Sequence, residues 1–378
     1  MRVVRLARLR EIAIVLKGKK PSMTIDAPTD DALPYILIEA FGGKYKAFTK
    51  DPACVRCYRD DTIVVADGAN SGLASINHNG FLGSTLVAVR PDQSKVNALY
   101  MFFFIRANFK TFNTRTRGAA VPHLDIELLL DLELPLPSLA EQERIVRILE
   151  EADALLRLRA NSDKRLTQTV PAIFFESFGD PTSNSRGLPI VKLGDIARIE
   201  RGKFTPRPRN DPAYFGGPYP FIQTGDISSS GGLLSNWQQT LNERGIAVSK
   251  QFPTGTIVFA IVGATIGQTA ILQVPVYCTD SIVGIQVDPK HAYTEYVEFV
   301  LRSRRRLLLA QAPDAARANL NLVIIRDLLI PLASVDAQRD FVKRCAEIRH
   351  LETVQAASRQ RLDDLFQSLL QQAFQGEL

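Results

Sequence analysis

Residues Leu134–Leu156 read LPLPSLAEQERIVRILEEADALL, and residues Ile330–Glu352 read IPLASVDAQRDFVKRCAEIRHLE. Both stretches place a Pro-Leu entry, a serine and a glutamine ahead of an amphipathic run. Their glutamines, Gln142 and Gln338, stand 196 positions apart. A short helix entry can recur by chance, so the decisive question is whether the surrounding sequence keeps the same offset.

The same offset holds on both sides of these two entries. YMFFFIR at Tyr100–Arg106 matches YVEFVLR at Tyr296–Arg302, and Phe178 aligns with Phe374. Upstream the offset drifts, as loop insertions would cause: TIVVADGANSG pairs with TIVFAIVGATIG, and VRLARLREIAIVLKGK pairs with VKLGDIARIERGK. Chance does not preserve a register over about seventy residues, so the chain is a tandem duplication.

Each copy has the same internal order. Short β-branched runs, broken by Gly, Pro and Asn turns, indicate a globular part, and a short helix around Tyr100 or Tyr296 follows. A long helix closes each copy; the first opens with the capping-box pattern Ser138–Glu141, and Pro171 is expected to break or kink it. We therefore predict an α+β chain with globular domains at 1–137 and 181–333, and helical regions at 138–180 and 334–378.

Apolar residues in both helical regions recur at spacings of three and four, which gives each helix an apolar stripe. We favour antiparallel pairing of the two helices about a pseudo-twofold axis, because two copies of one unit in one chain behave like a linked dimer. The alternative is that each helix packs only on its own domain. About thirty residues make a helix of roughly 45 Å, comparable with or somewhat above one turn of B-DNA, about 34 Å.

Composition is that of an ordinary globular protein, with 46% hydrophobic and 23% charged residues. Lys and Arg number 46 against 40 Asp and Glu, an excess that permits nucleic-acid binding without establishing it. No signal-peptide pattern and no apolar run of about 18 residues is present. Four scattered cysteines predict no disulfide framework, so we expect a reducing cytoplasm and no membrane partner.

Motifs for catalysis and metal binding are incomplete. NDPAYF at Asn210–Phe215 is similar to an amino-methyltransferase element but has alanine in place of its second proline, and no Gly-rich cofactor loop precedes it. RGKF and KGKK lack the upstream glycine of a phosphate-binding loop. CVRC at Cys54–Cys57 has no second ligand pair. We predict no catalytic residue, no metal ligand and no cofactor in this chain.

Basic loops recur at matching points of both copies. Four cations lie within the nine residues Arg201–Arg209, interleaved with Phe and Pro, and lysines fill Lys17–Lys20 in the first copy. Such loops offer cations to phosphates, and Asn, Gln or His to base edges; a solvated basic surface is the alternative. The candidate DNA-contacting residues are Lys17, Lys19, Lys20, Lys44, Lys46, Asn70, Ser71, Arg115, Arg117, His123, Arg201, Lys203, Arg207, Arg209, Gln223, Thr224, Thr265, Arg317, Asn319 and Asn321.

With these motifs in view, the chain resembles the specificity (S) subunit of type I restriction–modification systems. The two helix entries are similar to the family pattern IPLPPLxEQxxIV, and GTIVFAIVGATIGQ at Gly255–Gln268 is similar to GDIxxARxGAxxGK. PFIQTGDI at Pro220–Ile227 is similar to PYIxxGDI, and the linker FFESFGDP also fits. The match covers both copies, with departures at Ala337, where the family usually has Glu, and at Asn70 and Ser71.

The resemblance implies two target-recognition domains, each reading one half of a bipartite, asymmetric DNA site. The paired helices would set the gap and dock two modification (methyltransferase) subunits, and restriction subunits would join them. Those partners would bring S-adenosylmethionine, and ATP with Mg²⁺, while this chain supplies specificity alone. The alternatives are a fused restriction or methylation enzyme and a protein scaffold. Candidate docking and spacer residues on the helices are Gln142, Ile145, Leu149, Leu156, Gln338, Phe341, Ile348, Leu362 and Leu369.

Overall fold

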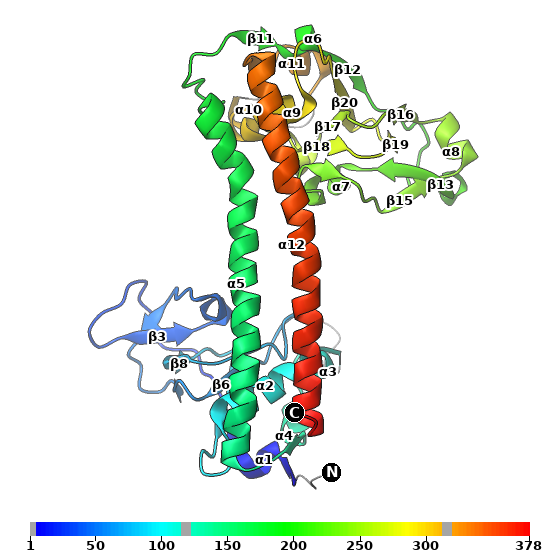
Figure 1. Cartoon of the computed structure of the whole chain (residues 1–378). Helices are drawn as coiled ribbons and strands as arrows, with labels where there is room; N and C mark the ends of the chain where they lie inside the picture. Colours follow the sequence, from blue (N-terminus) through cyan, green and yellow to red (C-terminus); the bar gives the residue numbers. More distant parts are fainter. Residues whose placement is uncertain (1–4, 115–121, 312–319) are drawn as a thin grey trace. The chain divides into compact units, whose positions relative to one another are not determined.

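The computed structural model (Figure 1) describes residues 5–114, 122–311 and 320–378. Short strands and short helices form two tandem globular regions, and each is followed by a long helix, α5 (Leu139–Phe178) or α12 (Val335–Gln375). The predicted α+β fold, with two repeats and two long helices, is confirmed. None of the helices in the described ranges has both the length and the apolar character needed to span a bilayer.

The chain divides into two compact units by its internal contacts. Unit 1 comprises Met1–Ser162 and Gln355–Leu378, and unit 2 comprises Asp163–Val354. The division passes through both long helices, so each helix begins in the unit of its own repeat and ends in the other unit. The predicted boundaries, which separate the helical regions from the globular domains, remain a prediction.

The described residues of unit 1 form two four-stranded sheets and one strand pair. The central sheet is antiparallel, in the order β2 (Ala13–Lys17), β9 (Leu86–Pro91), β6 (Thr62–Val65) and β7 (Ala74–Ser75). The second sheet, in which β3 and β8 are parallel, has the order β4 (Phe48–Thr49), β3 (Leu33–Ile36), β8 (Gly80–Leu82) and β5 (Arg56–Cys57). The pair joins β1 (Leu6–Arg8) to β10 (Glu133–Pro135) just ahead of α5.

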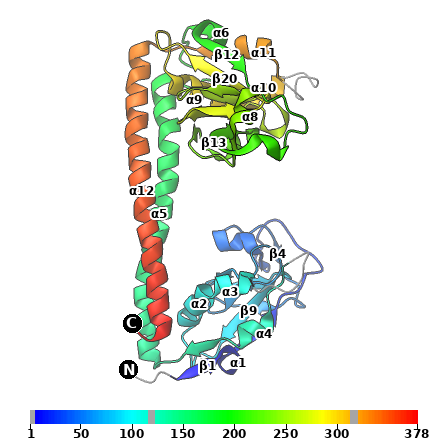
Figure 2. The same ribbon diagram turned by 90° about the vertical axis from the view of Figure 1, so that its right-hand side faces the viewer.

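Both faces of the central sheet in unit 1 are covered. Val64, Val87 and Val89 share a core with the buried side chains of helix α2, which lies on that face (Figure 2). Ile63 and Val65 point the other way, into a core shared with the second sheet, as strand pleating requires. The helices of this unit, besides the long ones, are α1 (Leu9–Ile12), η1 (Ile38–Gly42), α2 (Ala98–Ala107), α3 (Phe109–Thr114) and α4 (Ile126–Leu130).

Unit 2 repeats this plan with additional elements. Its central sheet has the order β12 (Ala197–Arg201), β20 (Ile282–Val287), β17 (Ile257–Ala260), β18 (Thr269–Leu272) and β14 (Leu233–Leu234). The second sheet has the order β15 (Gln239–Leu241), β13 (Phe215–Ile222), β19 (Val276–Cys278) and β16 (Lys250–Phe252), and β11 (Ile190–Lys192) pairs with β21 (Leu329–Pro331). Its short helices are α6 (Leu193–Ile196), η2 (Pro212–Tyr214), α7 (Thr224–Ser229), α8 (Glu243–Ala247), η3 (Gly263–Thr265), α9 (Thr294–Ser303), α10 (Arg305–Gln311) and α11 (Leu322–Arg326).

The repeated glutamine ties the head of each long helix to its own domain. Gln142 is fully buried; its Oε1 accepts from the Asn97 amide at 2.8 Å, and its Nε2 donates to the Pro137 carbonyl at 2.9 Å. Gln338 is equally buried, accepts from the Tyr293 amide at 2.8 Å and donates to the Ala333 carbonyl at 2.8 Å. The partners keep the offset of the repeat, so the glutamine performs the same structural task twice.

A buried tyrosine makes the second repeated tie. The Tyr100 hydroxyl donates to the Pro135 carbonyl at 3.0 Å, and the Tyr296 hydroxyl donates to the Pro331 carbonyl at 2.7 Å. Burial raises the pKa of Tyr296 to about 12 and also raises that of Tyr100, so both phenols remain protonated donors near neutral pH. These bonds hold the strand that precedes each long helix.

The end of each long helix packs in the other repeat's unit. In unit 1, Phe374 of α12 contacts Tyr100, with ring centroids 5.3 Å apart; in unit 2, Phe178 of α5 contacts Tyr296 at 5.0 Å. Within each unit α5 and α12 lie side by side and run antiparallel (Figure 1 and Figure 2). Antiparallel pairing is therefore confirmed, and the alternative, in which each helix packs only on its own domain, is wrong.

Helix α5 continues through Pro171 to Phe178, so the predicted break at Pro171 is wrong, while the other predicted outcome, a kink, stays a prediction. A proline inside a helix removes one hydrogen bond and costs about 3 kcal/mol. The segment beyond it carries Phe174, whose ring stacks on Phe299 with centroids 4.1 Å apart and also contacts Phe341. Burial of these aromatic rings offsets the cost of the proline, so tertiary packing overrides the local signal.

Replacing Gln142 by leucine should destabilise unit 1 by about 1–3 kcal/mol, because it leaves the Asn97 amide and the Pro137 carbonyl without their partner. Denaturant unfolding measures the loss. The matched control is Gln367→Leu, an exposed glutamine that belongs to the same unit. Equal effects of the two substitutions would contradict a structural role for Gln142.

Phe366→Ala should cost unit 1 about 3–5 kcal/mol, because this ring, 2% exposed, packs on Phe103 and under the Arg106 guanidinium. The neighbouring Leu365 is 51% exposed, so Leu365→Ala should change stability by no more than about 0.5 kcal/mol. Hydrogen exchange followed segment by segment would locate the loss. Protection should fall in the first repeat's globular region and remain unchanged in unit 2.

Candidate nucleic-acid interface

The basic loop of unit 2 leaves one end of the central sheet. Strand β12 ends at Arg201 opposite Val283, and β17 ends at Ala260 opposite Ile282, at the start of β20. Because β20 is antiparallel to both neighbours, the ends of β12 and β17 lie together beside the residues that precede β20. The loop after β12 and the loop after β17 therefore emerge at the same edge.

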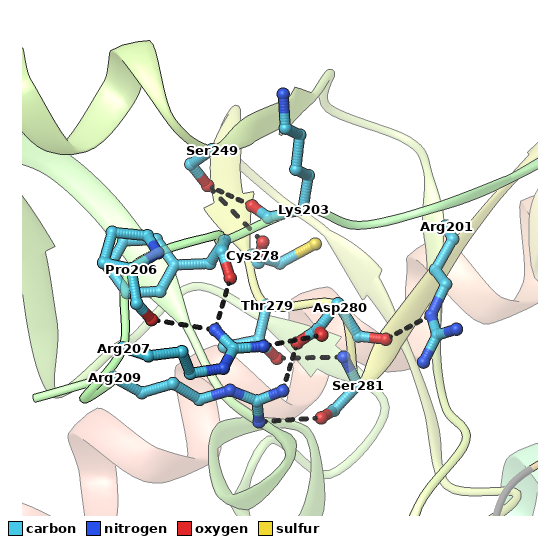
Figure 3. A network of polar contacts seen from close by, with 11 residues as sticks. Arg201, Lys203, Pro206, Arg207, Arg209, Ser249, Cys278, Thr279, Asp280 and Ser281 are labelled. Carbon is cyan, nitrogen blue, oxygen red and sulfur yellow. Dashed lines mark hydrogen bonds and ion pairs between the residues drawn. The ribbon is translucent and has the colours of Figure 1, made fainter.

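Asp280, two residues before β20, contacts three arginines of this edge (Figure 3). Its carboxylate accepts from Arg207 at 3.2 Å through Oδ2 and from Arg209 through Oδ1, and its backbone carbonyl accepts from Arg201. The side chains of Arg207 and Arg209 remain 53% and 45% exposed. The group keeps a net positive charge, because three guanidinium groups surround one carboxylate.

Buried aromatic packing holds the middle of the loop. Phe204, 1% exposed, contacts Phe221 with ring centroids 4.9 Å apart and packs on Tyr214 and Phe215. Lys203 precedes this ring with an exposed side chain, and its carbonyl accepts from Ser249 Oγ at 2.8 Å. The interleaved apolar residue therefore fixes the loop while the cations face solvent.

A glycine lets the loop leave the sheet in both units. The Gly202 amide donates to the Ile282 carbonyl, and a Cβ at this position would lie 2.2 Å from the Thr279 carbonyl oxygen. At Gly18 a Cβ would lie 1.9 Å from the Gly83 carbonyl oxygen. The glycine between two cations is thus required by close backbone approach.

Unit 1 presents its own set of polar groups at the matching edge. Lys17, Lys19 and Lys20 have exposed side chains at and just after the end of β2. His123 Nδ1 lies 2.7 Å from Asp67 Oδ1 on the loop after β6. Ser84 occupies the position of Asp280, so this edge has no carboxylate at that point.

Other predicted contact residues serve the loops around these edges. Gln223 caps α7 and donates to Gln239 at 2.7 Å, and Thr224 opens the same helix. Thr265 Oγ1 donates to the Val262 carbonyl at 2.9 Å, and Asn321 caps α11 by accepting from Ile324. Their predicted contacts with bases remain a prediction.

The first repeat supplies three more of the predicted residues. Lys44 and Asn70 are exposed. Lys46 donates to Glu39 at 2.6 Å, which holds the pKa of the Glu39 carboxyl below its usual range. Their contact with DNA also remains a prediction.

Ser71 is a correction. Its side chain is fully buried, and Oγ donates to the Ala66 carbonyl at 3.2 Å, so it cannot meet a nucleic acid directly. It stabilises the turn that presents the exposed Asn70. Four predicted contact residues lie outside the described part of the chain: Arg115, Arg117, Arg317 and Asn319.

The predicted docking and spacer residues all lie on α5 or α12, but the docking role of part of the set is a second correction. Five of them are buried inside their own units and have no surface for a partner: Gln142, Ile145, Leu149, Gln338 and Phe341. Leu156 and Leu369 pack against the unit 1 core, and Ile348 and Leu362 are half-buried. The apolar stripe is therefore used mainly for intramolecular packing, because the globular domains cover it.

Both cysteines of the CVRC motif in the first repeat are buried. Burial raises the pKa of the Cys57 thiol to about 11, and its Sγ lies 3.4 Å from the Gly80 carbonyl oxygen. Within the described ranges, no group of three or more His, Cys, Asp or Glu side chains is arranged to hold a metal ion.

Sequence reasoning missed Asp280 and the packing of Phe204. Asp280 is about seventy residues away from the arginines that it contacts, so no local pattern connects them. The repeat does contain a signal, because Ser84 and Asp280 occupy equivalent positions and differ in charge. The difference between Ser84 and Asp280 bears on the basic loop only because strand pairing in the sheet brings Asp280 beside that loop.

Comparison with known proteins places the chain among its relatives. The family model described as the type I restriction modification DNA specificity domain matches twice, at residues 4–168 and 187–348. The type I restriction enzyme MjaVIII specificity subunit of Methanocaldococcus jannaschii is 25% identical over 215 residues, 53% of this chain and 50% of that protein. The EcoBI specificity subunit of Escherichia coli is 22% identical over 362 residues, 85% of this chain and 74% of that protein.

The match to the first of these relatives thus spans half of that protein's length.

Two solved structures share the fold. The S subunit of a type I restriction–modification system from M. genitalium has a TM-score of 0.60 at 14% identity, covering 99% of this chain and 97% of that one. A chain from work on assembly and conformational transition of the type I system has a TM-score of 0.62 at 19% identity, covering 99% and 98%. Since the family model covers both repeats, the chain belongs to the type I restriction–modification DNA specificity family.

Proposed function

We propose that this chain is the DNA specificity subunit of a type I restriction–modification complex, and that each unit reads one half of a bipartite site. The observation that carries the proposal is the recurrence of exposed cations at the same edge of both central sheets, Lys17–Lys20 in unit 1 and Arg201–Arg209 in unit 2. Exposed cations bind phosphates, and the neighbouring polar loops contact base edges.

The two halves of the site differ in sequence. The scaffold repeats closely, down to the partners of Gln142 and Gln338, whereas the loops at the sheet edges do not. Unit 2 presents arginines around a carboxylate, and unit 1 presents lysines with a histidine–aspartate pair, His123 and Asp67. Different donors at equivalent positions select different base edges.

Modification subunits dock on the long helices at two equivalent places. The helices carry large apolar side chains in solvent at Leu155 (51% exposed) and Leu158 (65%), and at Leu351 (46%) and Val354 (52%). Each pair is the other displaced by 196 positions. A recurring exposed apolar pair favours two copies of one partner, which covers the same chemistry twice.

Chemistry then belongs to the partner subunits in this proposal. Modification subunits supply S-adenosylmethionine and methyl transfer, and restriction subunits supply ATP hydrolysis with Mg²⁺ and cleavage. What supports the assignment is that both repeats match the model of a specificity family and that the catalytic motifs of the sequence are incomplete.

Exchange of residues 1–137 for the corresponding region of another specificity subunit should change one half of the methylated sequence and leave the other half intact. Each half depends on loops carried by one repeat, so the units are separable readers. Methylome sequencing of cells that express the chain with its modification subunit measures this. An exchange that alters both halves, or neither, contradicts the proposal; the matched control is the same exchange of residues 181–333.

A charge placed in one exposed apolar pair should remove one partner. Leu158→Glu and Val354→Glu should each reduce the bound modification subunits from two to one, and the double variant should bind none, because burying an unpaired carboxylate opposes docking. Native mass spectrometry of the purified complexes gives the stoichiometry. Leu365→Glu is the control, since Leu365 is 51% exposed and its counterpart in the repeat is the polar Thr169.

A further inference from the structure

Asp280 makes a contact that the repeat does not duplicate. Its two carboxylate oxygens accept hydrogen bonds from different guanidinium groups: Oδ2 from Arg207 and Oδ1 from Arg209 (Figure 3). The carboxylate side chain is itself 30% exposed, so it shares the solvent-facing edge with the arginines. In unit 1 the equivalent residue is Ser84, and no acidic side chain replaces it at that position.

Both arginines are held at further points. Arg207 Nη1 also donates to the carbonyls of Phe204 and Pro206, at 2.9 and 2.8 Å. Arg209 Nη1 also donates to Ser281 Oγ at 3.4 Å. An arginine that is tethered on one side retains donors for a ligand, and less side-chain entropy is lost when the ligand binds.

The support behind Asp280 is rigid. Ser281 follows it and leads directly into β20, the strand that pairs with both β12 and β17. Phe204, whose carbonyl oxygen accepts a hydrogen bond from Arg207, is buried in the aromatic cluster under the loop. Arg207 and Arg209 are therefore held between the start of β20 and the buried Phe204. The Asp280 carboxylate, which precedes β20, binds both of them.

A carboxylate among phosphate-binding cations has a cost. It repels the phosphate backbone, so a loop selected only for non-specific attraction to DNA would be better without it. Base readout by arginine, in contrast, depends on the direction of a planar fork of donors. The negative charge of Asp280 lowers the attraction of the loop to DNA of any sequence. The fixed direction that it gives the arginines favours hydrogen bonding to particular base edges.

We infer that Asp280 is a positioning residue for DNA recognition in unit 2: it orients Arg207 and Arg209 toward base edges and so sets the specificity for the half-site that this unit reads. The inference rests on the proposed function and goes beyond it, because it assigns specificity to an acidic residue outside the basic loop. It also confines the effect to one half-site, since Ser84 gives unit 1 no such device.

The test uses the full chain together with its modification subunit. The half-sites come from selection of bound sequences out of duplexes of random sequence. Binding is then measured by competition with the selected duplex and with versions in which one half is replaced by unrelated sequence. Asp280→Asn should lower discrimination for the half-site of unit 2 about tenfold, within the range for one well-oriented base contact. Discrimination for the half-site of unit 1 should stay unchanged.

The variant Asp288→Asn controls for the change in net charge that Asp280→Asn makes. Asp288 follows β20 in the same unit, its side chain is 44% exposed, and it pairs with His291 at 3.4 Å rather than with an arginine of the loop. This variant makes the same change in net charge and should leave discrimination at both halves unchanged. If Asp280→Asn tightens binding to all duplexes equally, as a simple loss of repulsion would, the inference is overturned.

Coupling to the arginines is tested in a second background. In the Arg207→Ala, Arg209→Ala variant, adding Asp280→Asn should have no further effect on discrimination, because the groups that it positions are gone. An undiminished effect in this background overturns the inference. Thermal unfolding of each variant checks that unit 2 remains folded; a fully folded Asp280→Asn variant with unaltered discrimination also overturns it.

Failure of the proposed function gives a different result. A wild-type complex that selects no sequence from the random duplexes refutes DNA recognition itself. A wild-type complex that selects a two-part sequence, with equal behaviour of Asp280→Asn and wild type, refutes only the role of Asp280.

Discussion

The hydrogen bonds of one buried glutamine side chain, made twice, determine how this molecule is built. Gln142 and Gln338 enter the first turn of a long helix and at the same time satisfy backbone groups of the domain that the helix leaves. A buried amide without partners costs about 1–3 kcal/mol per group, so the helix entry and the domain can adopt only this register. Each long helix is thereby hydrogen-bonded to its own domain at its first turn.

The opposite ends of the helices depend on aromatic packing instead. Phe174 and Phe178 complete the core of the second domain, and Phe366 with Phe374 completes that of the first. Each globular core is thus built from one continuous stretch plus a helix end contributed by the other repeat. A hydrogen-bonded head and an aromatic end make two different kinds of interface on one helix.

The repeat made much of this fold predictable from sequence. A constant offset relates Tyr100 to Tyr296 and Gln142 to Gln338, and the structure gives both members of each pair the same partners. Prediction failed where tertiary contacts overrode a local rule. Pro171 lies inside a continuous helix because the aromatic residues beyond it are buried, and Ser71 is buried although it sits in a polar loop.

Site residues were harder to predict than the fold. The clustering of Arg201–Arg209 is visible in sequence, because the cations are adjacent. Asp280 is distant along the chain, and only strand pairing brings it to the loop. Ile145 and Phe341 have the spacing of a docking stripe, yet the domains cover them. Periodicity identifies a buried face without identifying what buries it.

One unit is a single chain segment and the other is made of two, and this difference has a consequence for folding during synthesis. Unit 2 is one uninterrupted segment, Asp163–Val354, whereas unit 1 joins Met1–Ser162 to Gln355–Leu378. On the ribosome the second repeat can therefore close its core while the first still lacks Phe366 and Leu370. The region made first is completed last, and its aromatic surface around Phe103 stays uncovered until the final turns of α12 emerge.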